Sequence, residues 1–278
     1  MDKISLKIQL LYDSMGKAEK KIADWIFQNP GKIISLSIVE LAEQCKCSEA
    51  TIVRFSKKLG LDGYQGLKIS IASESGTSIV STNVSFEDSI FTMFEKVCNE
   101  IYCSLELTKK SLSSENLENA AKKISNAKKI SIFGLGNSAA IALDASHKFL
   151  RAGLNSVAYS DNHMQVIAAS HMSDGDVAIA ISHSGSSKDI VDALKIARDH
   201  GATTIAISNR GKSPIDKYSD IILSTSSNET EYNILALNSR IAQLAIIDAL
   251  YYYIAFNCSE NVLASIKETE RSLLSKKY

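Results

Sequence analysis

The stretch AIAISHSGSSKDIVDAL, residues 178–194, decides the fold. An apolar, strand-like run ends in a loop that holds four serines, a histidine and a glycine, and the chain then resumes as an amphipathic helix. A strand that ends in such a loop and opens a helix is one βα unit. Because the first N–H groups of a helix have no partner within it, this junction favours a polar, usually anionic, ligand.

Other β-rich runs repeat this pattern along the chain. With the run at 176–182 they make five expected strands, the others being at 129–133, 155–160, 203–208 and 220–225. Helix-like sequence fills the intervals, which predicts a doubly wound, five-stranded parallel α/β domain covered on both faces. Further helices are expected over 87–112, 114–127 and 232–257, the last being one long helix followed by a short one.

Composition sets limits on location and chemistry. Of 278 residues 45% are hydrophobic and 22% charged, as in ordinary globular proteins. The start MDKISLKIQLLYDS lacks a secretory signal, and no apolar run approaches the ~20 residues that span a bilayer. Five cysteines, an odd number, indicate a reducing compartment. We expect a cytoplasmic protein with no membrane partner, no metal and no cofactor, since Cys45 and Cys47 lack a second pair at ligand spacing.

The segment SESGTSIVSTNVS, residues 73–85, is small and polar, which is typical of a linker. Before it the pattern is helical throughout. The predicted organisation is an all-α domain at 1–74, a linker at 75–86 and the α/β domain at 87–278.

The all-α domain has the pattern of a helix-turn-helix. Ser37 is expected to cap a short helix, the CKC of residues 45–47 to form the turn, Ser48 to cap a second helix, and Gly60 to end it. On the second helix Ile52, Phe55 and Leu59 share an apolar face.

Thr51, Arg54 and Lys58 share another face of this second helix, with Lys57 beside them. Residues 46–68 carry five basic side chains against two acidic ones, a net charge of +3. This is the pattern of a recognition helix for DNA. The alternative is a small helical bundle with a solvated charged face.

The domain resembles the N-terminal domain of RpiR-family bacterial transcriptional regulators. The matching motifs are Asn29-Pro30, S-x-x-E-L-A at 37–42, S-x-A-T-I-V-R-F-x-K-K-L-G at 48–60, and Gly63-Tyr64. The resemblance implies that the DNA-facing helix presents Ser48, Glu49, Thr51, Arg54, Lys57 and Lys58. It also implies that Tyr64 and Lys68 lie near the DNA backbone.

A second strand-to-helix junction, FGLGNS at 133–138, places Asn137 and Ser138 at the mouth of a helix. The dinucleotide fingerprint is incomplete at this junction, which disfavours a nicotinamide or flavin cofactor. In the serine loop at 182–187 no lysine follows in a G-K-[ST] arrangement, which disfavours a nucleoside triphosphate. Ser182, Ser184 and Ser187, with Gly185 permitting close approach, suit a phosphate monoester on a small polar molecule. The alternative is that these serines simply cap a helix.

Residues 128–257 resemble the SIS (sugar isomerase) phosphosugar-binding fold. The matching motifs are G-L-G-N-S at 134–138, D-N-H at 161–163, DVAIAISHSGSSKDI at 176–190, Ser213-Pro214 with Asp220, and SRIAQLAIID at 239–248. The resemblance implies that Ser138, Ser182, Ser184 and Ser187 bind the sugar's phosphate. The predicted site comprises Gly136, Asn137, Ser138, Asp161, His163, Ser182, His183, Ser184, Gly185, Ser187 and Glu229.

An isomerase needs a general base, for which His163, His183, Glu229 and Glu231 are candidates. No acid–base pair is visible, and an attached DNA-binding domain favours a non-catalytic sensor. We therefore predict a transcriptional regulator that senses a phosphorylated sugar or amino sugar and controls sugar-catabolism genes. The alternative is an SIS-type sugar-phosphate isomerase that retains activity. The expected partners are a double-stranded DNA operator, the effector and further copies of the chain in a homodimer or tetramer, since one helix-turn-helix reads a single half-site.

Overall fold

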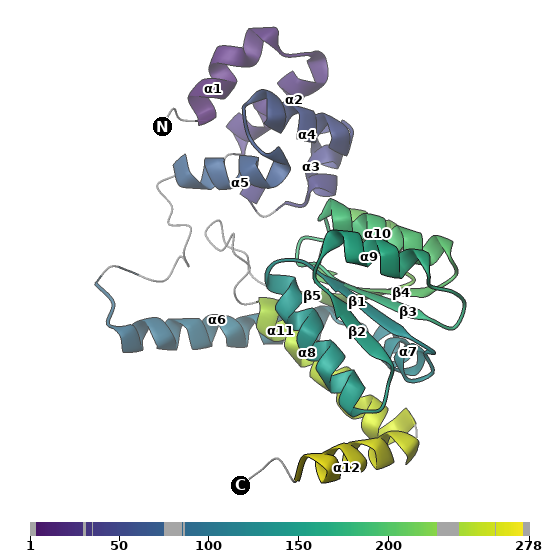
Figure 1. Ribbon diagram of the computed structural model, residues 1–278. Coiled ribbons are helices and arrows are strands. Elements are labelled where there is room, and N and C mark those ends of the chain that lie inside the picture. The colour runs from purple at the N-terminus through teal and green to yellow at the C-terminus, as the bar shows by residue number, and fades with distance from the viewer. Residues whose placement is uncertain are drawn as a thin grey trace. The chain divides into compact units, whose positions relative to one another are not determined.

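The computed structural model describes residues 4–29, 32–34, 36–74, 85, 87–226, 239–258 and 260–274 (Figure 1). Contacts divide the chain into two compact units, one built mainly from residues 1–100 and the other mainly from residues 101–278. Helix α6, Ile90–Ser111, contributes to both units. The predicted linker at 75–86 lies outside the described residues, apart from Ser85.

The N-terminal unit is built from helices, as predicted. They are α1 (Ile4–Leu11), α2 (Lys17–Gln28), α3 (Ile38–Cys45), α4 (Glu49–Lys58) and α5 (Gly63–Glu74), with 3-10 turns at Tyr12–Ser14 and Lys32–Ile34. Each of the five helices places a fully buried side chain in one shared core; these include Ile8, Ile22, Leu41, Phe55 and Leu67. Burying each such side chain contributes about 1.5–3 kcal/mol, so this core holds the short helices in place.

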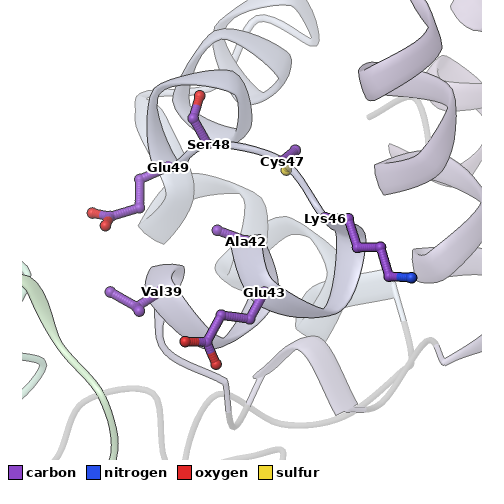
Figure 2. A pocket seen from close by; sticks show the side chains of 7 residues that line it. All are labelled: Val39, Ala42, Glu43, Lys46, Cys47, Ser48 and Glu49. Carbon is purple, nitrogen blue, oxygen red and sulfur yellow. The ribbon is translucent and has the colours of Figure 1, made fainter.

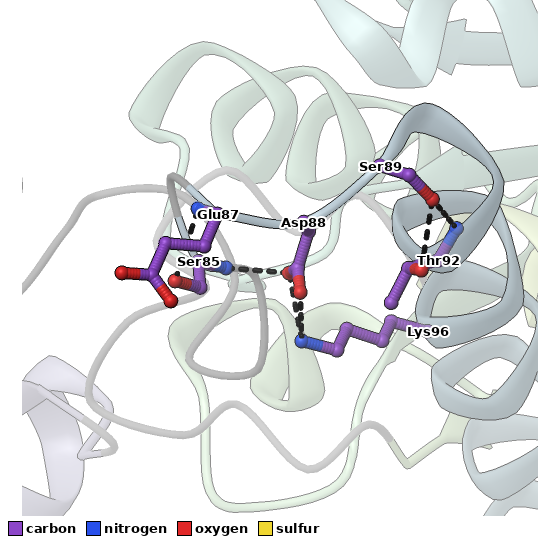
Figure 3. Close-up of polar contacts among 6 residues, drawn as sticks. All are labelled: Ser85, Glu87, Asp88, Ser89, Thr92 and Lys96. Carbon is purple, nitrogen blue, oxygen red and sulfur yellow. Dashed lines mark hydrogen bonds and ion pairs between the residues drawn. The ribbon is translucent and has the colours of Figure 1, made fainter.

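A local network of polar contacts fixes the start of α6 (Figure 3). The Ser89 hydroxyl accepts a hydrogen bond from the Thr92 N–H at 3.1 Å, which caps the helix. One turn further on, Lys96 pairs with the Asp88 carboxylate at 2.7 Å. The helix therefore begins three residues after the predicted start at residue 87.

The second unit contains the predicted five-stranded parallel sheet. Its strands are β1 (Ile130–Gly134), β2 (Ser156–Tyr159), β3 (Val177–Ile181), β4 (Thr203–Asn209) and β5 (Ile221–Thr225). The strand order is β2-β1-β3-β4-β5, and every neighbouring pair is parallel. From β1 the chain passes to β2 on one side, whereas β3, β4 and β5 follow one another on the other side of β1. This reversal creates a switch point, where open α/β sheets bind ligands outside the carboxyl ends of their strands.

Helices cover both faces of this sheet, as the doubly wound prediction requires (Figure 1). They are α7 (Ser114–Ser125), α8 (Asn137–Arg151), α9 (Asn162–Ser170), α10 (Lys188–Asp199) and α11 (Ser239–Tyr253). On one face Ile132, Ile179 and Ile207 pack with α7, α8 and α11. On the other face Ala178 and Ala180 pack with α9 and α10, where small side chains let the helices lie close to the sheet.

The C-terminal helices differ from the prediction in one respect. Residues 227–238 lie outside the described residues, so the predicted helix at 232–257 is seen from Ser239, and it continues as a π-helical turn at Ile254–Cys258. The last helix is not short: α12 spans Glu260–Leu274, 15 residues, as many as α11. Arg151 of α8 pairs with Glu270, and this tertiary contact helps to stabilise α12 over its length.

One stretch, Ser239–Cys258, is long and apolar enough to cross a membrane by length and composition. The sequence-based expectation that no run approaches such a length is therefore wrong. Ala242, Ile246 and Leu250 of this stretch are buried in the core that α11 shares with the sheet. These contacts place one side of the helix in the core of the α/β unit.

Candidate functional sites

The turn between α3 and α4 is built as predicted. The Ser37 hydroxyl accepts from the Glu40 N–H at 3.2 Å, and the Glu40 carboxylate accepts from the Ser37 N–H at 2.7 Å, so α3 begins with a capping box. The chain leaves α3 through Lys46, which has a left-handed backbone with φ of +50°. Ser48 then caps α4 by accepting from the Thr51 N–H at 3.3 Å.

Helix α4 has the two predicted faces. Ile52 and Phe55 are fully buried, and Leu59 after the helix is nearly so. Arg54 and Lys57 are exposed, and the Arg54 guanidinium lies 3.4 Å from the Thr51 hydroxyl. Gly60, with φ of +77°, ends the helix as predicted. The helix thus presents a guanidinium and an ammonium on its solvent side.

Three of the other predicted DNA-binding side chains contact the domain itself. The Lys58 ammonium donates to the Ser14 carbonyl at 2.8 Å and pairs with Glu19 at 2.9 Å. The Tyr64 hydroxyl lies 3.0 Å from the Leu36 carbonyl, and burial raises the pKa of Tyr64 well above its usual value. The Lys68 ammonium donates to the same carbonyl at 3.2 Å. These contacts tie the segments around α4 together.

A pocket of about 640 Å³ opens at the turn between α3 and α4 (Figure 2). Its lining residues are Val39, Ala42, Glu43, Lys46, Cys47, Ser48 and Glu49. Burial raises the pKa of the neighbouring Cys45 thiol to about 11 and also raises that of Cys47. Both thiols are therefore protonated near neutral pH, which disfavours metal ligation and nucleophilic chemistry.

In the α/β unit the loop after β1 leads directly into α8. A Cβ on Gly134 would lie 2.6 Å from the Ser138 carbonyl oxygen, so only glycine permits this close turn. Gly136, with φ of +54°, precedes the helix and brings no side chain to cap it. Asn137 is exposed and Ser138 half-buried at the helix start. The N–H groups of Ser138 and Ala139 donate to the Leu135 and Gly136 carbonyls, both at 3.1 Å, and no side chain caps the helix.

The loop after β3 is a second, similar junction. Gly185 has φ of +60° and its N–H donates to the Ser182 carbonyl at 3.1 Å. The Ser184 hydroxyl accepts from the Ser186 N–H at 3.2 Å. Ser187 stands at the N-cap position of α10, yet its side chain makes no bond to that helix. Ser184 and Ser187 are exposed, whereas Ser182 is buried and His183 half-buried.

The sheet brings these two loops together. In the ladder between β1 and β3, Gly134 lies opposite Ile181, so both loops leave the carboxyl edge at the same level. On the other side of β1, Phe133 lies opposite Tyr159, which precedes the predicted Asp161 and His163. Both of these side chains are exposed, and Asp161 caps α9 by accepting from the Met164 N–H at 2.9 Å. Three neighbouring strand ends therefore supply the predicted site, except for Glu229, which lies outside the described residues.

Sequence reasoning missed Gln165, a fully buried side chain on α9. Its amide donates to the Tyr159 carbonyl at 2.8 Å and to the Gly134 carbonyl at 3.2 Å. Within the part of the chain that the structure describes, its Oε1 atom has no partner. Gln165 thus links the ends of β1 and β2 directly beneath the loops of the site. The sequence shows only a glutamine shortly after the D-N-H motif of residues 161–163, which does not reveal its burial.

Charged groups elsewhere in this unit serve packing. Lys148 of α8 lies between Asp144 at 2.6 Å and Asp248 of α11 at 2.5 Å. Across the described ranges, no three His, Cys, Asp or Glu side chains gather as a metal site would require.

Comparisons with known proteins agree with this architecture. Residues 3–78 match the model of the helix-turn-helix domain of the rpiR family, and residues 123–253 match the SIS domain. A helix-turn-helix transcriptional regulator of Caldanaerobacter subterraneus subsp. tengcongensis is 38% identical over 272 residues, 97% of this chain and 96% of that protein. The regulator HexR of Pseudomonas aeruginosa is 32% identical over 274 residues, 98% of this chain and 96% of HexR.

Among solved structures, Vibrio vulnificus NanR complexed with ManNAc-6P has the same fold, with a TM-score of 0.84. The match covers 99% of this chain and all of NanR at 21% identity.

A helix-turn-helix unit joined to a SIS unit defines a class of transcriptional regulator. The chain belongs to the RpiR family of these regulators. The isomerase alternative is not favoured, because relatives that match nearly the whole chain are named as regulators.

Proposed function

We propose that α4 binds an operator in double-stranded DNA and that a phosphorylated sugar or amino sugar, bound at the β1/β3 edge, controls this binding. The observation that carries the effector site is the pair of strand-to-helix junctions at the switch point. The starts of α8 and α10 lack side-chain caps, and serine hydroxyls stand beside both. Uncapped helix starts with adjacent hydroxyls are a ready site for a phosphate group.

The phosphate-binding groups in this proposal are the hydroxyls of Ser138, Ser182, Ser184 and Ser187 together with the backbone N–H groups at Gly136 and Asn137, and Gly185 permits a close approach of the backbone. Asp161, His163, His183 and Glu229 are assigned to the sugar. The ManNAc-6P bound to the structurally similar NanR supports a phosphosugar as the class of effector.

For DNA, we assign base and phosphate contacts to Thr51, Arg54 and Lys57 on the exposed side of α4, with Ser48 and Glu49 at its start. Lys58, Tyr64 and Lys68 support the helix through their contacts within the domain. A single helix-turn-helix reads one half-site, so the regulator acts as a homodimer or a larger symmetric oligomer. Its place of action is the cytoplasm, where the DNA of a bacterium lies.

The experiment pairs two variants with one control. The full chain is titrated with phosphorylated sugars and their unphosphorylated parents by calorimetry, and with operator DNA selected from a random pool. Arg54→Ala removes DNA binding and keeps effector binding, whereas Ser184→Ala does the reverse. Lys109→Ala, which removes one charge from an exposed position on α6, changes neither. An unchanged effector affinity in Ser184→Ala overturns the site.

A further inference from the structure

One lysine on the outward face of α4, Lys58, is bonded to another part of the same domain. Thr51, Arg54 and Lys58 follow one another at helical spacing, which led us to expect all three to face DNA. Lys58, however, has its ammonium held at 2.8 Å from the Ser14 carbonyl and 2.9 Å from the Glu19 carboxylate. Its charge is matched by a partner that lies 39 residues earlier in the chain.

Glu19 is itself fixed in position. It is the third residue of α2, and its Oε2 atom accepts from the Gly16 N–H at 2.9 Å as well as from Lys58. The side chains of Lys58 and Glu19 are only 31% and 20% exposed. The hydrogen bond from Lys58, followed by that from Gly16, lowers the pKa of Glu19, which is therefore ionised at neutral pH. The ionised Glu19 carboxylate therefore competes with a DNA phosphate for the Lys58 ammonium at neutral pH.

We infer that Glu19 is a positioning residue that keeps Lys58 from the DNA backbone, so that Arg54 and Lys57 provide the ionic contacts of α4. The Glu19–Lys58 pair joins the last turn of α4 to the start of α2. This inference rests on the proposed DNA interface and adds to it the number of phosphates that α4 neutralises.

Salt dependence of DNA binding counts such contacts directly. Each neutralised phosphate adds about 0.9 to the slope of the logarithm of affinity against the logarithm of salt concentration. The probe is a labelled DNA duplex of mixed sequence, titrated with the full chain between ~50 and ~200 mM salt. Lys57→Gln lowers the slope by about 0.9, whereas Lys58→Gln leaves it at the parent value.

Glu19→Gln provides the opposite test. Glutamine at the third helical position still accepts from the Gly16 N–H, but it no longer holds the ammonium by charge. Lys58 is then free to bind a phosphate, so the slope steepens by about 0.9 and affinity at low salt rises. The double variant Glu19→Gln with Lys58→Gln returns to the parent slope.

Two results overturn the inference. A loss of slope in Lys58→Gln equal to that in Lys57→Gln would mean that Lys58 contacts phosphate. A Glu19→Gln variant that binds more weakly with an unchanged slope would mean that Glu19 acts only on stability. Thermal unfolding of each variant separates folding defects from binding. If the parent chain itself shows no salt-dependent DNA binding, the proposed interface fails instead, which is a different outcome.

Discussion

Serines stand at helix starts in both units, but they are used differently. Ser48 in the N-terminal unit accepts from the Thr51 N–H and caps α4. Ser187 in the α/β unit occupies the same position before α10 and makes no bond to its helix. The Ser48 hydroxyl thus holds its helix, whereas the Ser187 hydroxyl makes no such bond and is assigned to the effector in the proposed site. One residue type at the same helix position therefore makes a capping bond in one unit and none in the other.

The largest expected effect comes from Gln165, which joins the strand ends beneath the effector loops. Gln165→Leu leaves the Tyr159 and Gly134 carbonyls without their donor, at a cost of about 1–3 kcal/mol for each group that stays buried. Chemical denaturation of the isolated variant measures the loss. Effector affinity falls too, because the β1 and β2 loops lose their common support. If the variant kept the stability and effector affinity of the parent, Gln165 would not support the effector loops.

Ser187→Ala is expected to act on binding alone. Hydrogen bonds to charged groups contribute about 1.5–3 kcal/mol, so the affinity for a phosphorylated sugar falls by ~10- to 100-fold. The unfolding free energy without effector stays at the parent value, since the side chain makes no bond to α10. Ser170→Ala is the matched control, because that hydroxyl bonds to Ile167 within its own helix. A loss of stability in Ser187→Ala without effector would show that Ser187 is a cap.

Ser48→Ala is expected to lower the stability of the N-terminal unit, unlike Ser187→Ala in its own unit. Removing an N-cap serine costs about 0.5–2 kcal/mol, which lowers the thermal midpoint of the N-terminal unit. Ser48→Asp keeps the cap and its stability, but it places a negative charge at the DNA-facing helix and weakens DNA binding. Calorimetric unfolding together with DNA titration distinguishes the two variants. If the thermal midpoint of Ser48→Ala equalled that of the parent, the Ser48 cap would not contribute to stability and would not differ from Ser187 in this respect.

The smallest effect concerns acid stability. The folded state lowers the pKa of Glu19 through its bond from Lys58, so this contribution is fully present above the unfolded value of about 4.3. It is lost as the pH falls through the folded pKa. Glu19→Gln therefore lowers the unfolding free energy at neutral pH by about 0.2–1 kcal/mol, the range of partly exposed pairs. The difference from the parent vanishes at low pH. A difference that persists there would assign the effect to packing.

Much of the fold was predictable because its signals are local. The strand at 176–182 is found at Val177–Ile181, and the glycines of both junctions mark turns that few other residues can make. Both helix-turn-helix caps were predicted because serine before a helix is a short-range signal. Both junction loops lie at one edge of the sheet because parallel strands end there together, a consequence of the predicted parallel sheet.

The rest depends on contacts between distant residues. Lys58 lies on the exposed face that the helical pattern predicted, but its ion-pair partner is 39 residues away, so the pattern alone could not show the pair. Gln165 looks polar and exposed in the sequence, but its donors reach carbonyls on two strands. Helix α12 contacts α8 through the Arg151–Glu270 pair, which joins residues far apart in the sequence. The prediction for Glu229 lies outside the described residues and stays a prediction.

The most direct test of the central claim is the affinity of the full chain for its selected operator, measured by fluorescence anisotropy at one fixed salt concentration. ManNAc-6P serves as the first phosphorylated sugar, followed by a panel of hexose and pentose phosphates, each beside its unphosphorylated parent. The account predicts that one phosphorylated sugar changes operator affinity by about 5- to 150-fold, the usual range of allosteric coupling, while its parent has no effect. Equal effects of sugar and sugar phosphate, or no effect of any member of the panel, would contradict it.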